Sequence, residues 1–141
     1  MRDALTSFGL LLLRAGFGGL MLVHGYQKLV DYQKLVETFP DPLGIGSQYS
    51  LMGAIGAEFG CSILLIVGLA TRLAALPLAF TMGVAHFVIH ANDAWQTKEL
   101  SAVYLCAYVA LFFTGPGHLS LDHLILKRLR GDSGQGSPPP G

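Results

Sequence analysis

The chain consists largely of four apolar stretches separated by short polar segments. These stretches cover residues 5–29, 51–70, 73–91 and 97–115. Each is close to the ~20 residues that an α-helix needs to cross the hydrocarbon core of a bilayer. Helices are favoured over strands because a strand exposed to lipid would leave its backbone polar groups without hydrogen bonds. The pattern therefore predicts an all-α fold, an integral membrane four-helix bundle formed as one domain by residues 1–130.

The polar segments predict how these helices are connected. The turn at 68–72 is so short that the second and third helices must be antiparallel neighbours. The longest connection, 30–50, includes residues 31–39, which we expect to form a short interfacial helix that ends at Pro40. Residues 8–13 resemble the apolar core of a signal peptide, but no small-residue cleavage site follows them, so we expect a retained helix.

The region after the fourth apolar stretch divides into two parts. Residues 119–129 are predicted to lie along the membrane interface, with Lys127, Arg128 and Arg130 close to anionic headgroups. Residues 131–141 are rich in Gly, Ser and Pro and are predicted to be a disordered tail.

Composition supports lipid as the surrounding solvent. Hydrophobic residues make up 52% of the chain and charged residues 13%, whereas a soluble domain carries about 25% charged residues. The nine basic and nine acidic residues balance, so there is no basic field that would attract nucleic acid. Cys61 and Cys106 lie singly in apolar runs and are expected to pack as thiols between helices. The expected partner is the lipid bilayer, with a redox partner protein or a second copy of the chain as further options.

The distribution of basic residues predicts the orientation. If the N-terminus is cytoplasmic, the opposite side holds Lys34 and Lys98, with Lys28 at the boundary. The cytoplasmic side then holds Arg2, Arg72, Lys127, Arg128 and Arg130. Because cytoplasmic loops carry an excess of Lys and Arg, both termini are expected on the cytoplasmic side.

Ionisable residues inside apolar helices are costly and mark a functional site by default. Given the alternating helix directions, six of them fall in one half of the bundle. They are His24, Lys28, Glu58, His86, His90 and Glu99. A buried Glu58 needs a partner, which Lys28, His24 or Arg14 could supply. Arg14 itself, central in its helix, could form a salt bridge, contact helix-end carbonyls or bind an anionic ligand.

Each of these residues also has a structural explanation. His24 and Lys28 could reach headgroups at the interface, and Glu99 could complement a helix dipole. His86 and His90 have the i, i+4 spacing of metal or haem ligands, but such pairs also arise by chance, so we expect neither metal nor haem there. Glycines in the first two helices are expected to permit close helix packing. They are Gly16, Gly18, Gly19, Gly53, Gly56 and Gly60.

Several short motifs together resemble the DoxX family of small bacterial membrane proteins. The first two are His24-Gly25-x-x-Lys28 and Ala57-Glu58-x-Gly60, followed by Gly68-Leu69-x-Thr71-Arg72 at the tight turn. The others are His86, Glu99, and Gly115-Pro116-Gly117 followed by Leu119-Ser120-Leu121-Asp122. The resemblance covers about residues 5–125, and it departs at Cys61, where members often have glycine.

This resemblance implies a redox context in a bacterial inner membrane. The family takes its name from a subunit of an archaeal quinol oxidase and thiosulfate:quinone oxidoreductase system. Other members are associated with oxidative, thiol or electrophile stress as membrane partners of soluble redox enzymes. The candidate site residues are therefore His24, Lys28, Glu58, His86 and Glu99, with Arg14, His90 and Arg72 in a second rank.

Two functions remain open from the sequence. In the first, the protein is a quinone-handling subunit in which His24 or His86 donates to a quinone oxygen, Glu58 passes protons and Lys28 offsets negative charge. The chain has no dinucleotide fingerprint and no iron–sulfur ligand pattern, so a partner would supply electrons. In the second, the protein is a non-enzymatic anchor that recruits a soluble partner. A proton-coupled exporter fits poorly, because Arg14 repels cations.

Overall fold

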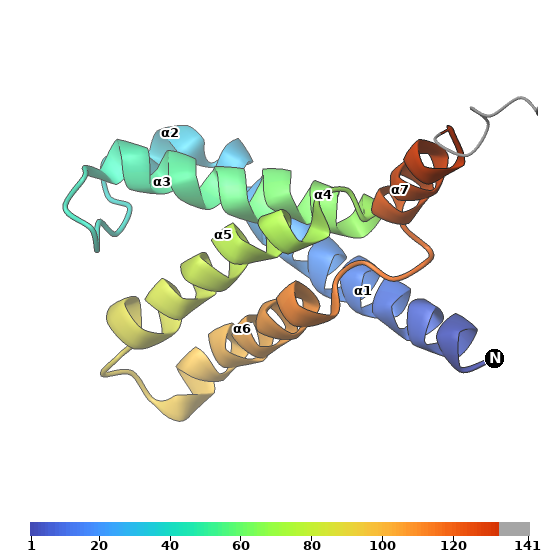
Figure 1. Ribbon diagram of the computed structural model, residues 1–141. Helices are drawn as coiled ribbons and strands as arrows, with labels where there is room; N and C mark the ends of the chain where they lie inside the picture. Colours follow the sequence, from blue (N-terminus) through green and yellow to red (C-terminus); the bar gives the residue numbers. More distant parts are fainter. Residues whose placement is uncertain (133–141) are drawn as a thin grey trace, which may run out of the picture.

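The computed structural model describes residues 1–132, in which helices are joined by loops and turns and no strand occurs (Figure 1). The predicted all-α class is confirmed. The long helical stretches are α1 (Arg2–Val30), then α3 (Ser47–Ile55), η1 (Gly56–Cys61) and α4 (Ser62–Val67) end to end, then α5 (Thr71–Val84) and η2 (Ala85–Ile89) end to end, and α6 (Trp95–Thr114). The segments η1 and η2 are π-helical. Two shorter helices are α2 (Tyr32–Leu35) and α7 (Leu121–Asp132).

Within residues 1–132, three helical stretches are long and apolar enough to cross a membrane. They are Arg2–Val30, Ser47–Val67 and Thr71–Ile89. The predicted fourth span corresponds to α6, which has 20 residues but is less apolar, since its first turns carry Gln96, Lys98 and Glu99. Of the predicted tail at 131–141, the first two positions end α7 and the others lie outside the described residues.

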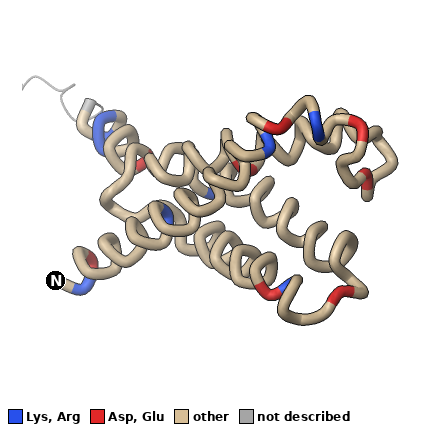
Figure 2. Tube along the Cα trace, turned by 180° about the vertical axis from the view of Figure 1, so that it is seen from behind, with Lys and Arg blue, Asp and Glu red and all other residues tan. Residues whose placement is uncertain are grey.

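The long helices form two pairs that touch at one end and diverge at the other. Helix α1 packs against η1 and α4, and α5 packs along α6. The pairs contact each other through α4, η1 and α5, whereas α3 and η2 separate (Figure 1). We call the end with the α4–α5 turn and the start of α7 the closed end, and the end with α3 and η2 the open end. Figure 2 shows Lys and Arg at the start of α1 and on α7, and acidic residues mainly toward the open end.

The core lies where the two pairs meet. It consists of Met21, Leu65, Ala75, Leu78, Met82, Tyr104, Tyr108 and Leu111. Many large apolar side chains outside this core are exposed, among them Leu12, Leu20, Leu73 and Phe113. An exposed apolar surface on long apolar helices is expected where lipid replaces water as the solvent.

Arg14 connects three segments at the closed end, namely α1, α4 and the segment before α7. Its side chain is completely buried, and its Nη1 donates to the carbonyl oxygens of Leu65 (3.3 Å) and Ile66 (3.2 Å). Its Nη2 donates to the carbonyl oxygen of Leu119. The last turn of a helix leaves carbonyls without intrahelical partners, and in an apolar environment these must be satisfied from elsewhere. The sequence left three options open for Arg14, and in the structure its side chain contacts helix-end carbonyls.

Gly68 makes room for this guanidinium. Its φ of +74° is in the left-handed region, and a Cβ there would collide with Arg14 and lie 2.6 Å from the Cβ of Ser120. Glycine alone satisfies both the backbone conformation and the close approach.

Asp122 caps a helix that is distant in sequence. Its Oδ1 accepts from the backbone N–H of Ala70 (2.7 Å) and its Oδ2 accepts from that of Thr71 (3.0 Å). Its own N–H donates to the carbonyl oxygen of Gly68 (3.0 Å). The carboxylate thus satisfies free N–H groups at the start of α5 and fastens the first turn of α7 to the α4–α5 turn.

The predicted packing glycines are mostly not packing sites. Of the six, only Gly18 approaches another element closely, with a Cβ position 2.8 Å from Cγ1 of Ile66, while the other five have open space there. Gly25 is the second close approach on α1. Because Gly18 and Gly25 are seven residues apart, they lie on one face of α1, toward η1 and α4.

We expect Asp122→Ala to lower the free energy of unfolding by about 0.5–2 kcal/mol, because the free N–H groups of Ala70 and Thr71 lose their cap. Asp122→Asn keeps one acceptor oxygen and should lose less. Thermal unfolding of the purified protein in detergent measures this, with Asp3→Ala as an exposed control. Equal losses for Asp122→Ala and Asp3→Ala would contradict the capping role.

Candidate ligand site

A buried ion pair lies toward the open end. Lys28 Nζ donates to Oε2 of Glu58 over 2.6 Å, and the side chains are 24% and 5% exposed, respectively. Of the three partners that the sequence offered Glu58, the structure selects Lys28. A carboxylate at this depth is tolerated because the ammonium compensates its charge.

Gly25 and the π-helix η1 bring the pair together. A Cβ on Gly25 would lie 2.5 Å from the backbone N of Phe59 and 2.6 Å from the carbonyl carbon of Glu58. The two backbones are thus in direct contact, and Lys28, one turn after Gly25, can reach Glu58. Glu58 lies in the first turn of η1, and π-helical turns occur frequently at functional sites.

The pair borders an apolar cavity of about 520 Å³. Helices α1, α3, α5 and α6 contribute to its wall, and so does the loop that contains Phe39 and Leu43. Lys28, Glu58 and His24 are the ionisable residues that α1 and η1 contribute, and His90 is a further one, from the end of η2. Pockets of this volume with apolar walls and a few polar groups are typical of small-molecule sites.

Two tyrosines of α6 extend the site into the core. Tyr104 lines the cavity, and its ring meets the His24 ring edge to face at 6.2 Å between centroids. Tyr104 also stacks on Tyr108 at 5.9 Å, and the Tyr108 hydroxyl donates to the carbonyl oxygen of Phe17 (3.3 Å). The hydropathy pattern and the motifs of the sequence do not mark these two residues. The sequence signal for them is two tyrosines one turn apart in the apolar part of α6.

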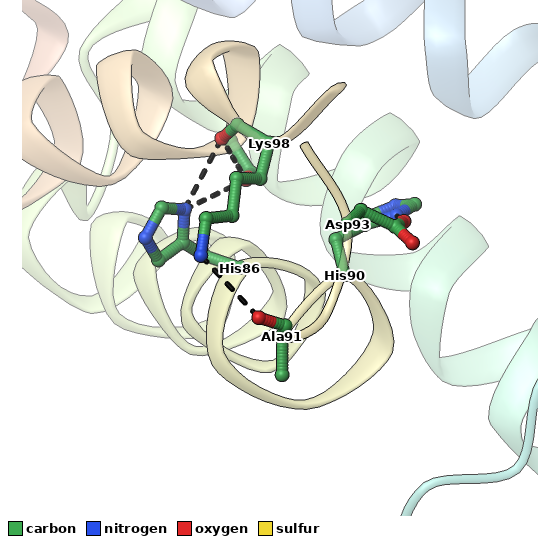
Figure 3. Close-up of polar contacts among 6 residues, drawn as sticks. His86, His90, Ala91, Asp93 and Lys98 are labelled. Carbon is green, nitrogen blue, oxygen red and sulfur yellow. Dashed lines mark hydrogen bonds and ion pairs between the residues drawn. The ribbon is translucent and has the colours of Figure 1, made fainter. Parts of the chain in front are cut away.

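His86 and His90 point to different neighbours (Figure 3). His86 Nδ1 lies 3.1 Å from the carbonyl oxygen of Lys98 and 3.3 Å from Oγ of Ser101, whereas His90 Nδ1 lies 2.7 Å from Oδ2 of Asp93. The shared face predicted from i, i+4 spacing assumed an α-helix, but this segment is π-helical and His90 already has non-helical dihedral angles. Residues 1–132 contain no group of three or more His, Cys, Asp and Glu that could hold a metal ion.

The other candidate residues lie elsewhere. Glu99 is exposed and is not part of the cavity wall, and His86 faces α6 instead of the cavity. Arg14 and Arg72 belong to the closed end, where Arg72 Nη2 lies 3.5 Å from the carbonyl oxygen of Phe113. The structure therefore brings together His24, Lys28 and Glu58, with His90 as a further wall residue.

A structured loop forms part of the cavity rim. Asp41 accepts from the backbone N–H groups of Gly46 (2.8 Å) and Ile45 (3.0 Å) and from the Ser50 hydroxyl (2.9 Å). The hydrogen bond from Gly46 is the main reason why the pKa of Asp41 is below its ordinary value. The ionised carboxylate holds the loop against the start of α3, next to Leu43 and Ile45 of the cavity wall.

Comparison with known proteins identifies the family. The DoxX family model matches residues 9–91, more than half of the chain. A protein of Haemophilus influenzae with uncharacterised function is 33% identical over 101 residues, 68% of this chain and 67% of the relative. A second uncharacterised protein of that organism is 27% identical over 116 residues, 77% and 84% of the two chains. No solved structure matches. The chain belongs to the DoxX family, and its apolar helices indicate a membrane protein.

We expect Gly25→Ala to be destabilising, because its Cβ would meet the backbone at Glu58 and Phe59. Gly19→Ala is the matched control on the same helix, since a Cβ there meets nothing within 4 Å. The control should be neutral or stabilising by up to about 1 kcal/mol, because Ala favours helix more than Gly. Thermal unfolding of both variants in detergent measures the difference. Equal behaviour would contradict a tight contact between α1 and η1.

We expect Lys28→Met to destabilise the protein strongly, toward the lower end of the about 3–5 kcal/mol typical of breaking a buried pair, because Lys28 is partly exposed. Glu58→Gln should cost less, since the amide oxygen can still accept from Lys28. The double variant Lys28→Met/Glu58→Gln should lose less than the sum of the single variants. Denaturant unfolding of the four proteins completes this cycle, and additive losses would show that the pair contributes nothing.

Proposed function

We propose that this DoxX-family protein binds a quinone in the cavity at the open end and is the membrane subunit of a quinone-linked redox or oxidative-stress system. The observation that supports this most is the composition of the cavity. The walls are largely apolar, and the polar groups that α1 and η1 add to them are Lys28, Glu58 and His24, on two helices in close contact. A quinone matches this arrangement, since it combines a flat apolar ring and an apolar tail with two carbonyl oxygens.

The polar groups have the chemistry that a quinone ring requires. The Lys28–Glu58 bond engages Oε2 of the carboxylate, so Oε1 and the other ammonium protons remain for a ligand. Lys28 or His24 would donate to a ring oxygen, and Lys28 would offset the negative charge that builds on the reduced ring. Glu58 would accept or release the accompanying proton. Electrons would come from a partner protein, which makes the chain a subunit of a larger system.

We also propose that α6 is a fourth membrane crossing and that both termini are cytoplasmic, in a bacterial inner membrane. Helix α6 packs along α5 over much of its length, and α5 is part of a candidate span. The excess of basic residues at the closed end supports the orientation, since cytoplasmic segments are enriched in Lys and Arg.

The quinone content of the purified protein tests the proposed ligand. We expect quinone to copurify with the wild type in mild detergent in a near-stoichiometric amount. The variant Glu58→Gln/His24→Ala should lose it, because both groups border the cavity. Glu99→Gln is the matched control, since the same chemical change falls on an exposed residue that is not part of the cavity wall. Organic extraction and a quinone assay per mole of folded protein give the readout.

The opposite result would favour the second function. If neither wild type nor variant holds quinone, even after quinone is added back, the cavity is not a quinone site. The Lys28–Glu58 pair would then be structural, and the protein would be a non-enzymatic anchor that recruits a soluble redox partner.

A further inference from the structure

Helix α7 leaves an apolar face uncovered at the closed end. Leu121, Leu124, Ile125 and Leu129 follow the i, i+3, i+4, i+8 spacing of one helix face and are 41%, 54%, 46% and 66% exposed. The opposite side has His123, Lys127 and Arg130, spaced i, i+4, i+7, next to the exposed Leu126, and Arg128 lies on the apolar side one turn after Leu124. Helix α7 is therefore amphipathic, and its apolar side is not buried against the bundle.

The bonds of Asp122 set the level at which α7 begins. The side chain caps Ala70 and Thr71, and the backbone N–H of Asp122 reaches Gly68. These residues form the turn between two candidate membrane spans, one ending at Val67 and the next starting at Thr71. The first turn of α7 is thus held at the depth where two spans leave the membrane, which is the interfacial level.

The charges of this region suit a negatively charged surface. Lys127, Arg128 and Arg130 fall within four positions. The one acidic side chain of the first turn, Asp122, bonds the backbone at the start of α5. Arg2 is the first residue of α1 and Arg72 is the second residue of α5. Figure 2 shows the basic residues of α7 and of the chain start at the same end of the molecule. Anionic lipid headgroups attract such basic segments beside membrane-spanning helices.

We propose that α7 is an interfacial helix that binds anionic phospholipid headgroups. Its apolar face lies at the boundary between headgroups and acyl chains, and Lys127 and Arg128 contact the lipid phosphates. Asp122 provides the attachment to the α4–α5 turn, so this helix can lie on the membrane only at the closed end. The inference is independent of the quinone site, which lies at the open end.

Tryptophan fluorescence of the full chain tests this placement. Trp95 is the only tryptophan of the sequence, so Trp95→Phe provides a dark background for a single reporter. Ile125→Trp reports on the apolar face, and Lys127→Trp is the control at an exposed position on the opposite side of the same helix. Both proteins are reconstituted in phosphatidylcholine, with and without phosphatidylglycerol, and quenched by lipids brominated at the upper part of the acyl chain.

We expect the reporter at position 125 to emit at shorter wavelength and to be quenched several-fold more than the reporter at position 127. The quenching should rise with phosphatidylglycerol. Lys127→Gln/Arg128→Gln should remove most of that rise, while Lys34→Gln/Lys98→Gln, which removes equal charge at the open end, should leave it unchanged.

Two results would overturn the proposal. Equal and weak quenching at both positions would show that α7 stands in water, where a soluble protein is the better candidate to cover its apolar face. Strong quenching at position 125 that does not depend on phosphatidylglycerol would show an interfacial helix without preference for anionic headgroups.

Discussion

The bundle depends on the burial of one guanidinium group. Arg14 lies in the middle of an apolar helix, where a charge without partners would be prohibitively costly. It resolves this by donating to carbonyl oxygens at the end of α4 and in the segment before α7. The bond to Ile66 satisfies a carbonyl oxygen in the last turn of α4, and the carbonyl oxygen of Leu65 accepts from the N–H of Gly68 as well as from Arg14. One side chain thus joins α1, α4 and the segment before α7 at the closed end.

The divergence of the helices at the other end follows from this attachment. Asp122 adds the start of α5 to the joined elements, so the α4–α5 turn and α7 are tied together. Away from this end, α1 stays against η1 through Gly25, whereas α3 and η2 separate and leave the cavity between them. The two ends use charge differently. At the closed end, the charged side chains hydrogen-bond to backbone groups of neighbouring helices. At the open end, the Lys28–Glu58 pair borders a cavity with room for a ligand.

Hydropathy predicted the all-helical class, and helix direction placed Lys28 and Glu58 at the same level. The pairing of Lys28 with Glu58 was one of the alternatives that spacing allowed. What the sequence did not reveal were the π-helical turns, because they arise from local backbone geometry that a 3.6-residue period cannot detect. The assumption of a regular α-helix also placed His86 and His90 on one face, whereas their rings contact different neighbours. The cap formed by Asp122 joins residues about 50 positions apart, so no local pattern marks it.

Photolabelling by a light-activated quinone analogue, with the intact protein in membranes, tests the central claim of a quinone site at the open end. We expect covalent attachment within α1 near His24 and Lys28, in η1, and on the part of α5 that includes Phe80 and Met82, since all of these border the cavity. Excess natural quinone should suppress this labelling. Attachment confined to lipid-facing residues such as Leu73 or Phe113, or attachment that excess quinone leaves unchanged, would contradict a specific site in this cavity.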